Sequence, residues 1–284
     1  MEHNGQTPSS YKLFVTTHQK GVHRNIDIHT HFHYELFIFH SGTCNYLIDN
    51  KVYPLVSGDI ILMDGSKLHK PSIQGDPSLY DRSIIQFSID WLAPLLQFLD
   101  SYHLVEPFER NHYSIYRTNN TGIDEVIQLM KRMEKLLLSQ NFFDVEMQLK
   151  IELVDLLFTI QRFQNKKLTE FENLENDKSA YIQQIATFVQ EHFKEKITLD
   201  DIADQINLSK SYLVHLFKEQ TGYTIMDYLM QYRFTQSLHL LKTYPDWTFK
   251  ELCQACGFKS EAHFSRFFKE RVGVTPREYR KYLG

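Results

Sequence analysis

The chain has 284 residues, which suits two domains rather than one, and its 42% apolar content is enough to bury a core in each. Its net charge of −4 excludes a uniformly basic protein, and three cysteines are too few for a disulfide-stabilised scaffold. No apolar run approaches the length of a membrane span, and the polar start Met1–Ser10 is unlike a signal peptide, so we expect reduced thiols and a cytoplasmic location.

Residues 11–89 show the pattern of short β-strands separated by turns. Alternation is clearest over Ile26–Ile38, and Ser41–Gly42 and Asp49–Asn50 have the composition of tight turns. Many short strands with regular turn signals predict a β-barrel or a β-sandwich. One face of the alternating stretch carries His29, His31, His33, Glu35, Phe37 and Phe39.

This histidine-bearing face is predicted to point inward, because exposing Phe37 and Phe39 together would be costly. Buried imidazoles and a buried carboxylate need hydrogen bonds, water, a ligand or a metal as partners. Structural hydrogen bonding is one interpretation, and the lining of a small-molecule pocket is another. A third is a divalent transition-metal site formed by His29, His31, Glu35 and His69.

Two amphipathic helices are predicted after the strands, over Gly122–Leu138 and Asp144–Phe163, with a shorter helix over Trp91–Leu99. Their apolar stripes either pack only on the barrel or also provide a dimer interface. Residues 165–178 are almost all charged or amide-bearing, which indicates a linker between domains. A helix over Tyr181–His192 then opens the second domain.

The last hundred residues contain one pattern twice. In the first copy, Thr198 and Asp201 form a capping box that starts a short helix, Asn207 stands at the turn, and Ser209 caps a second helix. A short helix, a turn and a second helix form the layout of a DNA-binding helix-turn-helix. The second copy uses Thr248, Glu251, Gly257 and Ser260 in the same roles.

The two copies also agree position by position after the turn. Between them, Thr224–Lys242 contains no Gly or Pro and is predicted to be a connecting helix, long enough to set the two modules about one DNA turn apart. A repeat this consistent indicates two copies of one module. The residues that recur at one constant offset are Ser209, Leu213, Phe217, Lys218, Glu219, Gly222, Thr224 and Tyr228.

Together these residues resemble the double helix-turn-helix domain of AraC/XylS-type bacterial transcription regulators. The resemblance is carried by Ser209–Lys218, Gly222, Arg233, Leu240–Leu241, Gly257–Phe258, Phe264–Lys269, Gly273–Pro276 and Tyr279–Arg280. The spacing of His29, His31, Glu35, Gly42, Gly58 and His69 is similar to the two motifs of a cupin barrel, the usual effector domain of sugar-responsive members of that family. The resemblance implies a promoter-binding homodimer that contacts RNA polymerase and responds to a small molecule, with a carbohydrate as the expected class.

The exposed positions of the second helix in each module are expected to face the DNA major groove. In the first module they are Lys210, Ser211, Val214, His215 and Lys218. In the second module they are Glu261, Ala262, Ser265, Arg266 and Lys269. Arg266 is the best candidate base reader, because a guanidinium grips guanine O6 and N7 together, whereas Lys218 and Lys269 suit phosphates.

The second domain also has a distinct net charge and two closely spaced cysteines. Residues from 179 onward carry a net charge of +2 against −6 for the remainder, so the basic residues gather where DNA is expected. Cys253 and Cys256 have C-x-x-C spacing, but that spacing falls inside the second module and no second pair exists. Buried packing is therefore favoured over a metal or redox role.

The sequence thus predicts an α+β protein with two domains. Residues 1–164 are expected to form a cupin-like β-barrel with two flanking helices that binds an effector and dimerises. Residues 165–178 are expected to be a linker, and residues 179–284 an all-α domain with two helix-turn-helix motifs. The expected function is sequence-specific DNA binding controlled by an effector, with no catalysis, cofactor or metal. The alternative is a cupin-type metal-dependent enzyme with an attached DNA-binding domain. The candidate effector-binding residues are His29, His31, His33, Glu35, Phe37 and His69.

Overall fold

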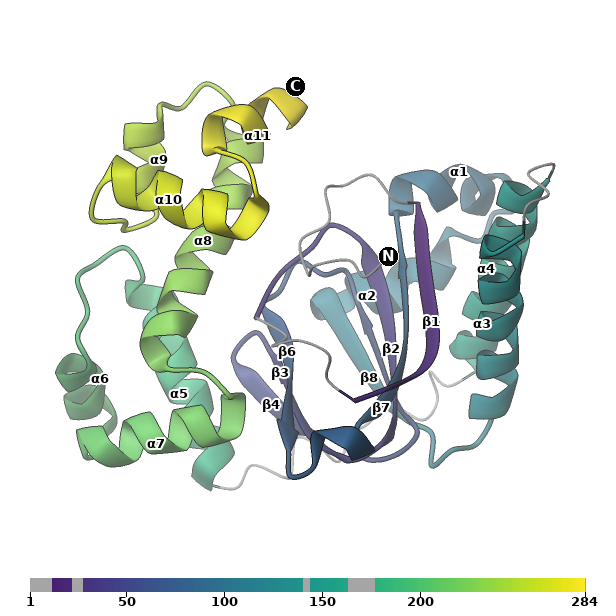
Figure 1. Cartoon of the computed structure of the whole chain (residues 1–284), viewed down its shortest axis with the longest axis horizontal. Helices are drawn as coiled ribbons and strands as arrows, with labels where there is room; N and C mark the ends of the chain where they lie inside the picture. Colours follow the sequence, from purple (N-terminus) through teal and green to yellow (C-terminus); the bar gives the residue numbers. More distant parts are fainter. Residues whose placement is uncertain (1–11, 22–27, 140–143, 163–176, 284) are drawn as a thin grey trace.

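The computed structural model describes residues 12–21, 28–139, 144–162 and 177–283. A β-rich part comes first along the chain and a helical part second, so the predicted α+β class is confirmed (Figure 1). Most of the predicted linker lies outside the described residues. Its last two residues, Asp177 and Lys178, already belong to a helix.

Antiparallel strands of the described residues form two sheets that enclose a common core. The five-stranded sheet has the order β1-β7-β2-β5-β8, and the three-stranded sheet has the order β4-β3-β6. The strand bounds are β1 Leu13–Lys20, β2 Tyr34–Ser41, β3 Thr43–Ile48, β4 Lys51–Pro54, β5 Asp59–Met63, β6 His69–Gln74, β7 Asp81–Phe87 and β8 Tyr113–Arg117.

The prediction of one strand over Ile26–Ile38 is wrong in its first half. Strand β2 begins only at Tyr34, and residues 28–33 have no strand beyond a single bridge between His29 and His69. The backbone of His31 is bonded instead to the Gly65 carbonyl in a loop, which takes this segment away from the sheet edge. Ile26 itself lies outside the described residues.

Side chains of β2 alternate between two cores, as expected for a strand covered on both faces. Leu36 and Ile38 belong to the core under the helices, and Phe37 and Phe39 belong to the core between the two sheets. The prediction that the Phe37 and Phe39 face points inward is therefore confirmed.

Helices cover the outer face of the five-stranded sheet (Figure 1). The predicted long pair appears as α3 and α4, which pack against each other and, through α3, against β1. The predicted short helix is α1, and strand β8 and helix α2 were not predicted. The bounds are α1 Ile89–Phe98, α2 Glu106–Glu109, α3 Ile123–Leu137 and α4 Val145–Gln161, with 3₁₀ turns at Pro77–Leu79, Tyr102–Val105 and Arg110–His112.

The helical part opens with the predicted helix, which begins four residues earlier than expected, at Asp177, and both repeated modules follow. The two capping boxes form, each with the threonine side chain bonded to the backbone of the acidic residue three positions later and the reverse. Asn207 and Gly257 both take left-handed conformations, with φ of 56° and 72°. The bounds are α5 Asp177–His192, α6 Leu199–Ile206, α7 Lys210–Thr221, α8 Ile225–Thr243, α9 Phe249–Ala255, α10 Glu261–Val272 and α11 Pro276–Leu283.

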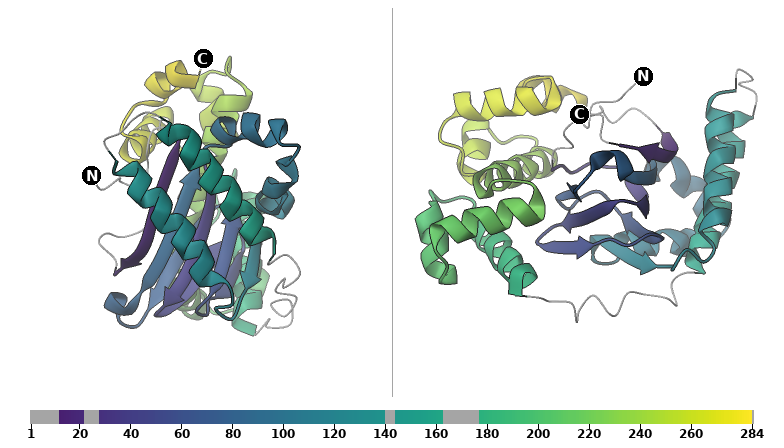
Figure 2. Two further views of the ribbon diagram at one scale, coloured as in Figure 1. Left: turned by 90° about the vertical axis from the view of Figure 1, so that its right-hand side faces the viewer. Right: turned by 60° about the horizontal axis from the view of Figure 1, so that its bottom comes forward.

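The helical part lies against the three-stranded sheet, on the opposite side of the β-rich part from α3 and α4 (Figures 1 and 2). Helix α5 contacts β4, and α7 contacts β3 and β6. Among the helices that the structure describes, none is long and apolar enough to cross a membrane.

Candidate functional site

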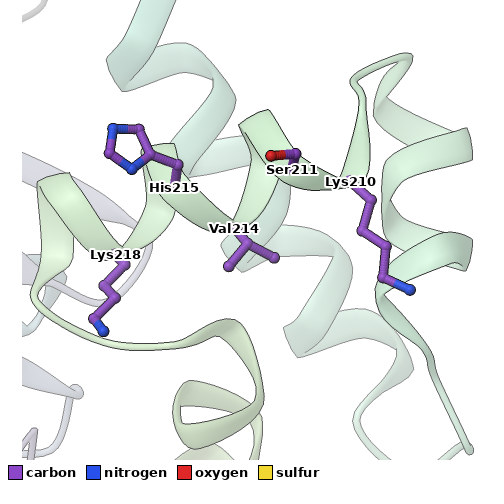
Figure 3. A pocket seen from close by; sticks show the side chains of 5 residues that line it. All are labelled: Lys210, Ser211, Val214, His215 and Lys218. Carbon is purple, nitrogen blue, oxygen red and sulfur yellow. The ribbon is translucent and has the colours of Figure 1, made fainter.

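The first module presents its five predicted DNA-facing side chains together. They project from helix α7 and line an open hollow of about 660 Å³ on the surface (Figure 3). Ser209 caps this helix by accepting a hydrogen bond from the Tyr212 backbone, and Leu213 and Phe217 hold its other face in the core. The hollow is lined by Lys210, Ser211, Val214, His215 and Lys218.

One residue of this set already has an ionic partner. The ammonium of Lys210 lies 2.9 Å from the Asp200 carboxylate on α6. Both side chains are more than half exposed, so the pair contributes little to stability and can exchange for a phosphate contact.

The second module is built in the same way around α10. Ser260 accepts from the His263 backbone, and Phe264 and Phe268 are buried against α8 and α9. The predicted DNA-facing residues are therefore left on the outer side of the helix: Glu261, Ala262, Arg266 and Lys269 are exposed, and Ser265 is half-buried.

Helix α8 sets the distance between the two modules. It has 19 residues, which corresponds to about 28 Å of rise, close to one turn of B-DNA. Arg233 fixes it to the segment between α5 and α6, since the guanidinium donates to the carbonyls of Phe193 and Glu195 at 2.7 Å each. The sequence marked Arg233 only through the family resemblance.

The C-x-x-C pair is part of the core of the second module. Cys253 and Cys256 are free thiols, buried among the apolar side chains of α8, α9 and α10. Burial raises the pKa of both thiols, to about 12 for Cys256, so neither is a ready thiolate ligand.

The β-rich part contains a small, partly open cavity between its two sheets, with a volume of about 90 Å³. Three predicted effector residues line it, namely His29, Glu35 and Phe37. Six further residues were missed by the sequence analysis: Tyr46, Pro71, Tyr80, Arg82, Ile84 and Gln86.

The missed residues could have been found from alternation in the later strands. Tyr80 directly precedes β7, and Arg82, Ile84 and Gln86 follow at every second position along the strand, so all four belong to one face.

Three imidazoles gather beside this cavity. The ring centroids of His29 and His69 are 4.5 Å apart, and those of His31 and His69 are 4.9 Å apart. Ring nitrogens of the three lie within 4.8 Å of one another, so this cluster could hold a divalent transition metal. His33 is buried two residues along the chain, but it does not line the cavity.

Hydrogen bonds orient the cluster. The Nδ1 of His69 is bonded to the Lys67 carbonyl at 2.8 Å, and its Nε2 is buried with no hydrogen-bond partner among the described residues. Burial lowers the pKa of His69 well below its usual value, which keeps this ring neutral.

Glu35 is the anionic member of the site. Burial by itself raises the pKa of this carboxyl, but the hydrogen bond and charge of His31, with Nε2 at 3.0 Å, and the bond from Gln86 outweigh it and lower the pKa to about 2. The cavity therefore offers an ionised carboxylate, imidazole nitrogens and the faces of aromatic rings. These groups can bind a small polar molecule.

The opposite face of the same three-stranded sheet carries the helical part. Tyr46 and Pro71 are paired across β3 and β6 and point into the cavity. Leu47, paired with Lys70 one position further along, points outward and is buried in a core shared with α5, α7 and α8. We call this outward surface of β3 and β6, together with the Asp49 turn, the docking face.

Polar contacts fix the first module on the docking face. The Asn45 amide donates to Gln220 of α7 at 3.4 Å, and the Gln74 amide donates to the Glu219 carbonyl at 3.1 Å. The ammonium of Lys70 lies 3.8 Å from the centre of the Tyr223 ring.

Two further tyrosine contacts reach the β-rich part. The hydroxyl of Tyr223 accepts from the backbone of Ile28, next to the histidine cluster. Tyr228 donates to the Asp49 carbonyl at 3.0 Å, and Gln190 donates to the Asp49 carboxylate at 2.8 Å. One face of the three-stranded sheet thus forms the cavity wall, and its other face is the docking face that holds the first module.

Known proteins share both parts. The family model for the AraC-like ligand binding domain matches residues 15–137, and the model for a helix-turn-helix domain matches residues 202–282. The HTH-type transcriptional activator RhaS of Escherichia fergusonii is 28% identical over 255 residues, covering 89% of this chain and 87% of that protein. RhaS of Escherichia coli is 26% identical over 258 residues, covering 89% and 87%.

Among solved structures, ToxT from Vibrio cholerae covers 96% of this chain and 96% of its own, at 18% identity and a TM-score of 0.38. The two matched family models, which together take in both the cavity and the repeated modules, settle the family. The chain belongs to the AraC family of transcription regulators, in which a ligand-binding domain controls a helix-turn-helix DNA-binding domain.

Proposed function

We propose that this regulator binds its promoter through α7 and α10 and senses a small polar effector, a carbohydrate in the first instance, in the cavity between its two sheets. The domain division is the predicted one, with 1–164 as the effector domain, 165–178 as the linker and 179–284 as the DNA-binding domain. The protein acts in the cytoplasm by binding and not by catalysis.

The DNA contacts are assigned from exposure on the two recognition helices. Each helix is held by a serine cap and by buried residues on one side, which leaves a polar outer side for the major groove. Helix α8 spaces them by about one DNA turn, so both can lie on the same face of the duplex. A single chain would then read two adjacent segments of one site.

The effector class is assigned from the chemistry of the cavity. A carboxylate, imidazoles and the Arg82 guanidinium can bond to hydroxyl groups, and Phe37, Tyr46 and Tyr80 offer ring faces for the apolar side of a sugar. A volume of about 90 Å³ holds roughly three water molecules, which is less than a monosaccharide needs. We therefore propose that effector binding shifts the two sheets relative to each other.

That shift carries the proposed regulation. Tyr46 and Pro71 form the cavity wall on β3 and β6, and the docking face on the other side of these strands contacts α7. A shift of β3 and β6 therefore moves the docking face and, with it, the first module. Effector and DNA are then coupled through one sheet, as two sites that bias a common conformational change. This double use of β3 and β6 is the observation that carries the proposal.

Two partners complete the proposed function. A second copy of the chain joins through the outer surface of α4, where Met147, Ile151 and Phe158 are exposed at helical spacing. RNA polymerase is the partner through which a bound regulator, named an activator in its RhaS relatives, would change transcription.

The test screens sugars for a thermal shift of the purified protein and then compares variants with the compound that binds. We expect Glu35→Gln and Gln86→Ala to lose the shift and the reporter response, because both alter the polar groups of the cavity. His103→Ala, an exposed histidine away from the cavity, is the control. Unchanged effector affinity in both cavity variants, with intact circular dichroism, would show that the effector binds elsewhere.

The rival enzyme hypothesis is tested in the same preparation. A cupin-type metalloenzyme requires stoichiometric metal and turns over its substrate, whereas a sensor releases the bound compound unchanged. Chromatography of the compound after long incubation with the protein separates the two.

A further inference from the structure

Strand β7 is flanked by an irregularity in each neighbouring strand at the same level. The register with β1 shifts after Thr16, and the register with β2 shifts after Phe39. His18 lies in the first irregularity with a φ of 48°, a left-handed conformation that is strained for histidine, and His40 lies in the second. Bulges of this kind re-aim a side chain and are frequent at functional sites.

The two irregularities bring together side chains that a regular sheet would keep apart. Strands β1 and β2 are separated by β7, so their backbones are about 9–10 Å apart. The rings of His18 and His40 are nevertheless stacked, with centroids 4.2 Å apart. Ser83 of β7 lies beneath them, and its small side chain leaves them room: its oxygen is 2.7 Å from Nε2 of His40 and 3.0 Å from the His18 backbone nitrogen.

A buried carboxylate faces the same point. One oxygen of Asp81 lies 2.9 Å from Nδ1 of His18. The other oxygen of Asp81 is buried and has no hydrogen-bond partner among the described residues, and Asp81 as a whole is only 6% exposed. A buried carboxylate oxygen without a partner is costly, which indicates a missing cation or donor.

The ligand atoms are close enough for one ion. Those of His18, His40 and Asp81 all lie within 4.8 Å of one another. The side chain of His18 is 45% exposed, which gives an ion a path from solvent.

We propose that His18, His40 and Asp81 form a binding site for a divalent transition-metal ion such as Zn²⁺. Two imidazoles and one carboxylate are a common ligand set for this ion, with water in the fourth position. Neighbouring ligand atoms in such a site are about 3.3 Å apart, so small side-chain rotations complete the geometry.

The site is separate from the cavity and its histidine cluster. Tyr80, directly before β7, and Arg82 of β7 line the cavity, whereas Asp81 and Ser83, at the alternate positions, point to the other side of the strand. An ion here would tie β1, β2 and β7 together by their side chains, at the end of the sheet that holds Arg82.

The experiment titrates the full-length, metal-stripped protein with Co²⁺, whose visible absorption bands report coordination number, and with Zn²⁺ in a calorimeter. We expect one ion to bind with tetrahedral or five-coordinate bands. His18→Ala and His40→Gln should weaken that ion by at least about tenfold, because each removes one of three ligands. Circular dichroism shows whether each variant is folded, and the exposed position of His18 makes its variant the safer one.

His69→Ala and His103→Ala distinguish this site from other histidines. The proposal requires the ion to persist in both variants. Loss of the ion in His69→Ala, with retention in His18→Ala and His40→Gln, would move the metal to the cavity cluster and overturn the proposal. Absence of stoichiometric binding in the unmodified protein would overturn it as well.

Discussion

At the scale of single residues, Arg266 and Lys218 differ in their expected work on DNA. Arg266 lies in the middle of α10 and Lys218 in the last turn of α7, and both are exposed. We predict that Arg266→Ala costs about 1–3 kcal/mol at one base pair and relaxes specificity there. Lys218→Ala should weaken all sequences alike and reduce the salt slope by about 1.

Fluorescence anisotropy with a panel of promoter sequences at several salt concentrations measures both effects. Lys242→Ala, an exposed lysine on the connecting helix, is the matched control and should change neither. Equal losses on every sequence for Arg266→Ala would contradict its role as a base reader.

Glu35 gives a prediction about pH. Its pKa falls from about 4.5 in the unfolded chain to about 2 in the folded protein. The carboxylate therefore stabilises the fold fully above pH 4.5, and this contribution is lost as the pH falls toward 2.

Glu35→Gln is expected to lower the free energy of unfolding by about 1–3 kcal/mol at pH 7, because it replaces a charge-assisted hydrogen bond. The difference from the unmodified protein should shrink between pH 4.5 and pH 3. Urea denaturation at each pH measures it, with Glu106→Gln, an exposed glutamate, as the control. A difference that stays constant with pH would mean that Glu35 is not preferentially ionised in the folded state.

The structural role of a single residue could be predicted from the sequence where the contacts that determine it are local. The caps at Thr198 and Thr248 and the left-handed turn at Asn207 arise from contacts within four residues, and all three were predicted correctly. The contact between Tyr223 and Ile28 joins residues 195 positions apart and leaves no local signal.

At the scale of secondary-structure elements, helix α4 has apolar side chains on its outer side that are not buried in the core. Its inner side is buried by Leu153, Leu156 and other apolar residues, while Met147, Ile151 and Phe158 on the outer side are 50%, 57% and 44% exposed. These three lie at helical spacing on one stripe, which is the expected form of a helical dimer interface.

From the proposed dimer interface, we predict that Ile151→Glu shifts the protein toward the monomer, since a charge would face its copy across an apolar stripe. Gln148→Glu adds the same charge to an exposed position of α4 and should leave the dimer intact. Light scattering over a concentration series decides between them. A dimer that survives Ile151→Glu would place the interface elsewhere.

Elements were predicted well where periodicity was continuous and poorly where tertiary contacts interrupted it. The stripes of α3 and α4 identified both helices to within two residues at each end. The stretch before Tyr34 alternates like a strand, yet its backbone bonds to the loop at Gly65 and to His69 instead of a sheet. Pattern alone cannot show which partner a backbone will find.

At the scale of the whole molecule, the docking face makes the two parts one cooperative unit. Leu47 is fully buried although it points out of the β-rich part, because helices α5, α7 and α8 cover it. An apolar core that crosses between the parts links their unfolding, so we expect the unmodified protein to melt in a single calorimetric transition.

Leu47→Lys should separate the two parts without unfolding either. A lysine at this position would be buried without a partner while the parts are docked, and it becomes solvated when they separate. The single transition is then expected to split into two. The reporter should also lose its response to effector, because the docking face no longer holds α7. Binding of promoter DNA by the recognition helices should persist, since Leu47 packs in the core on the inner side of α7. Val56→Lys, which adds the same charge at a position already 43% exposed beside the same sheet, is the control and should keep one transition and a normal response. A single transition with a full effector response in Leu47→Lys would show that the signal does not pass through the docking face.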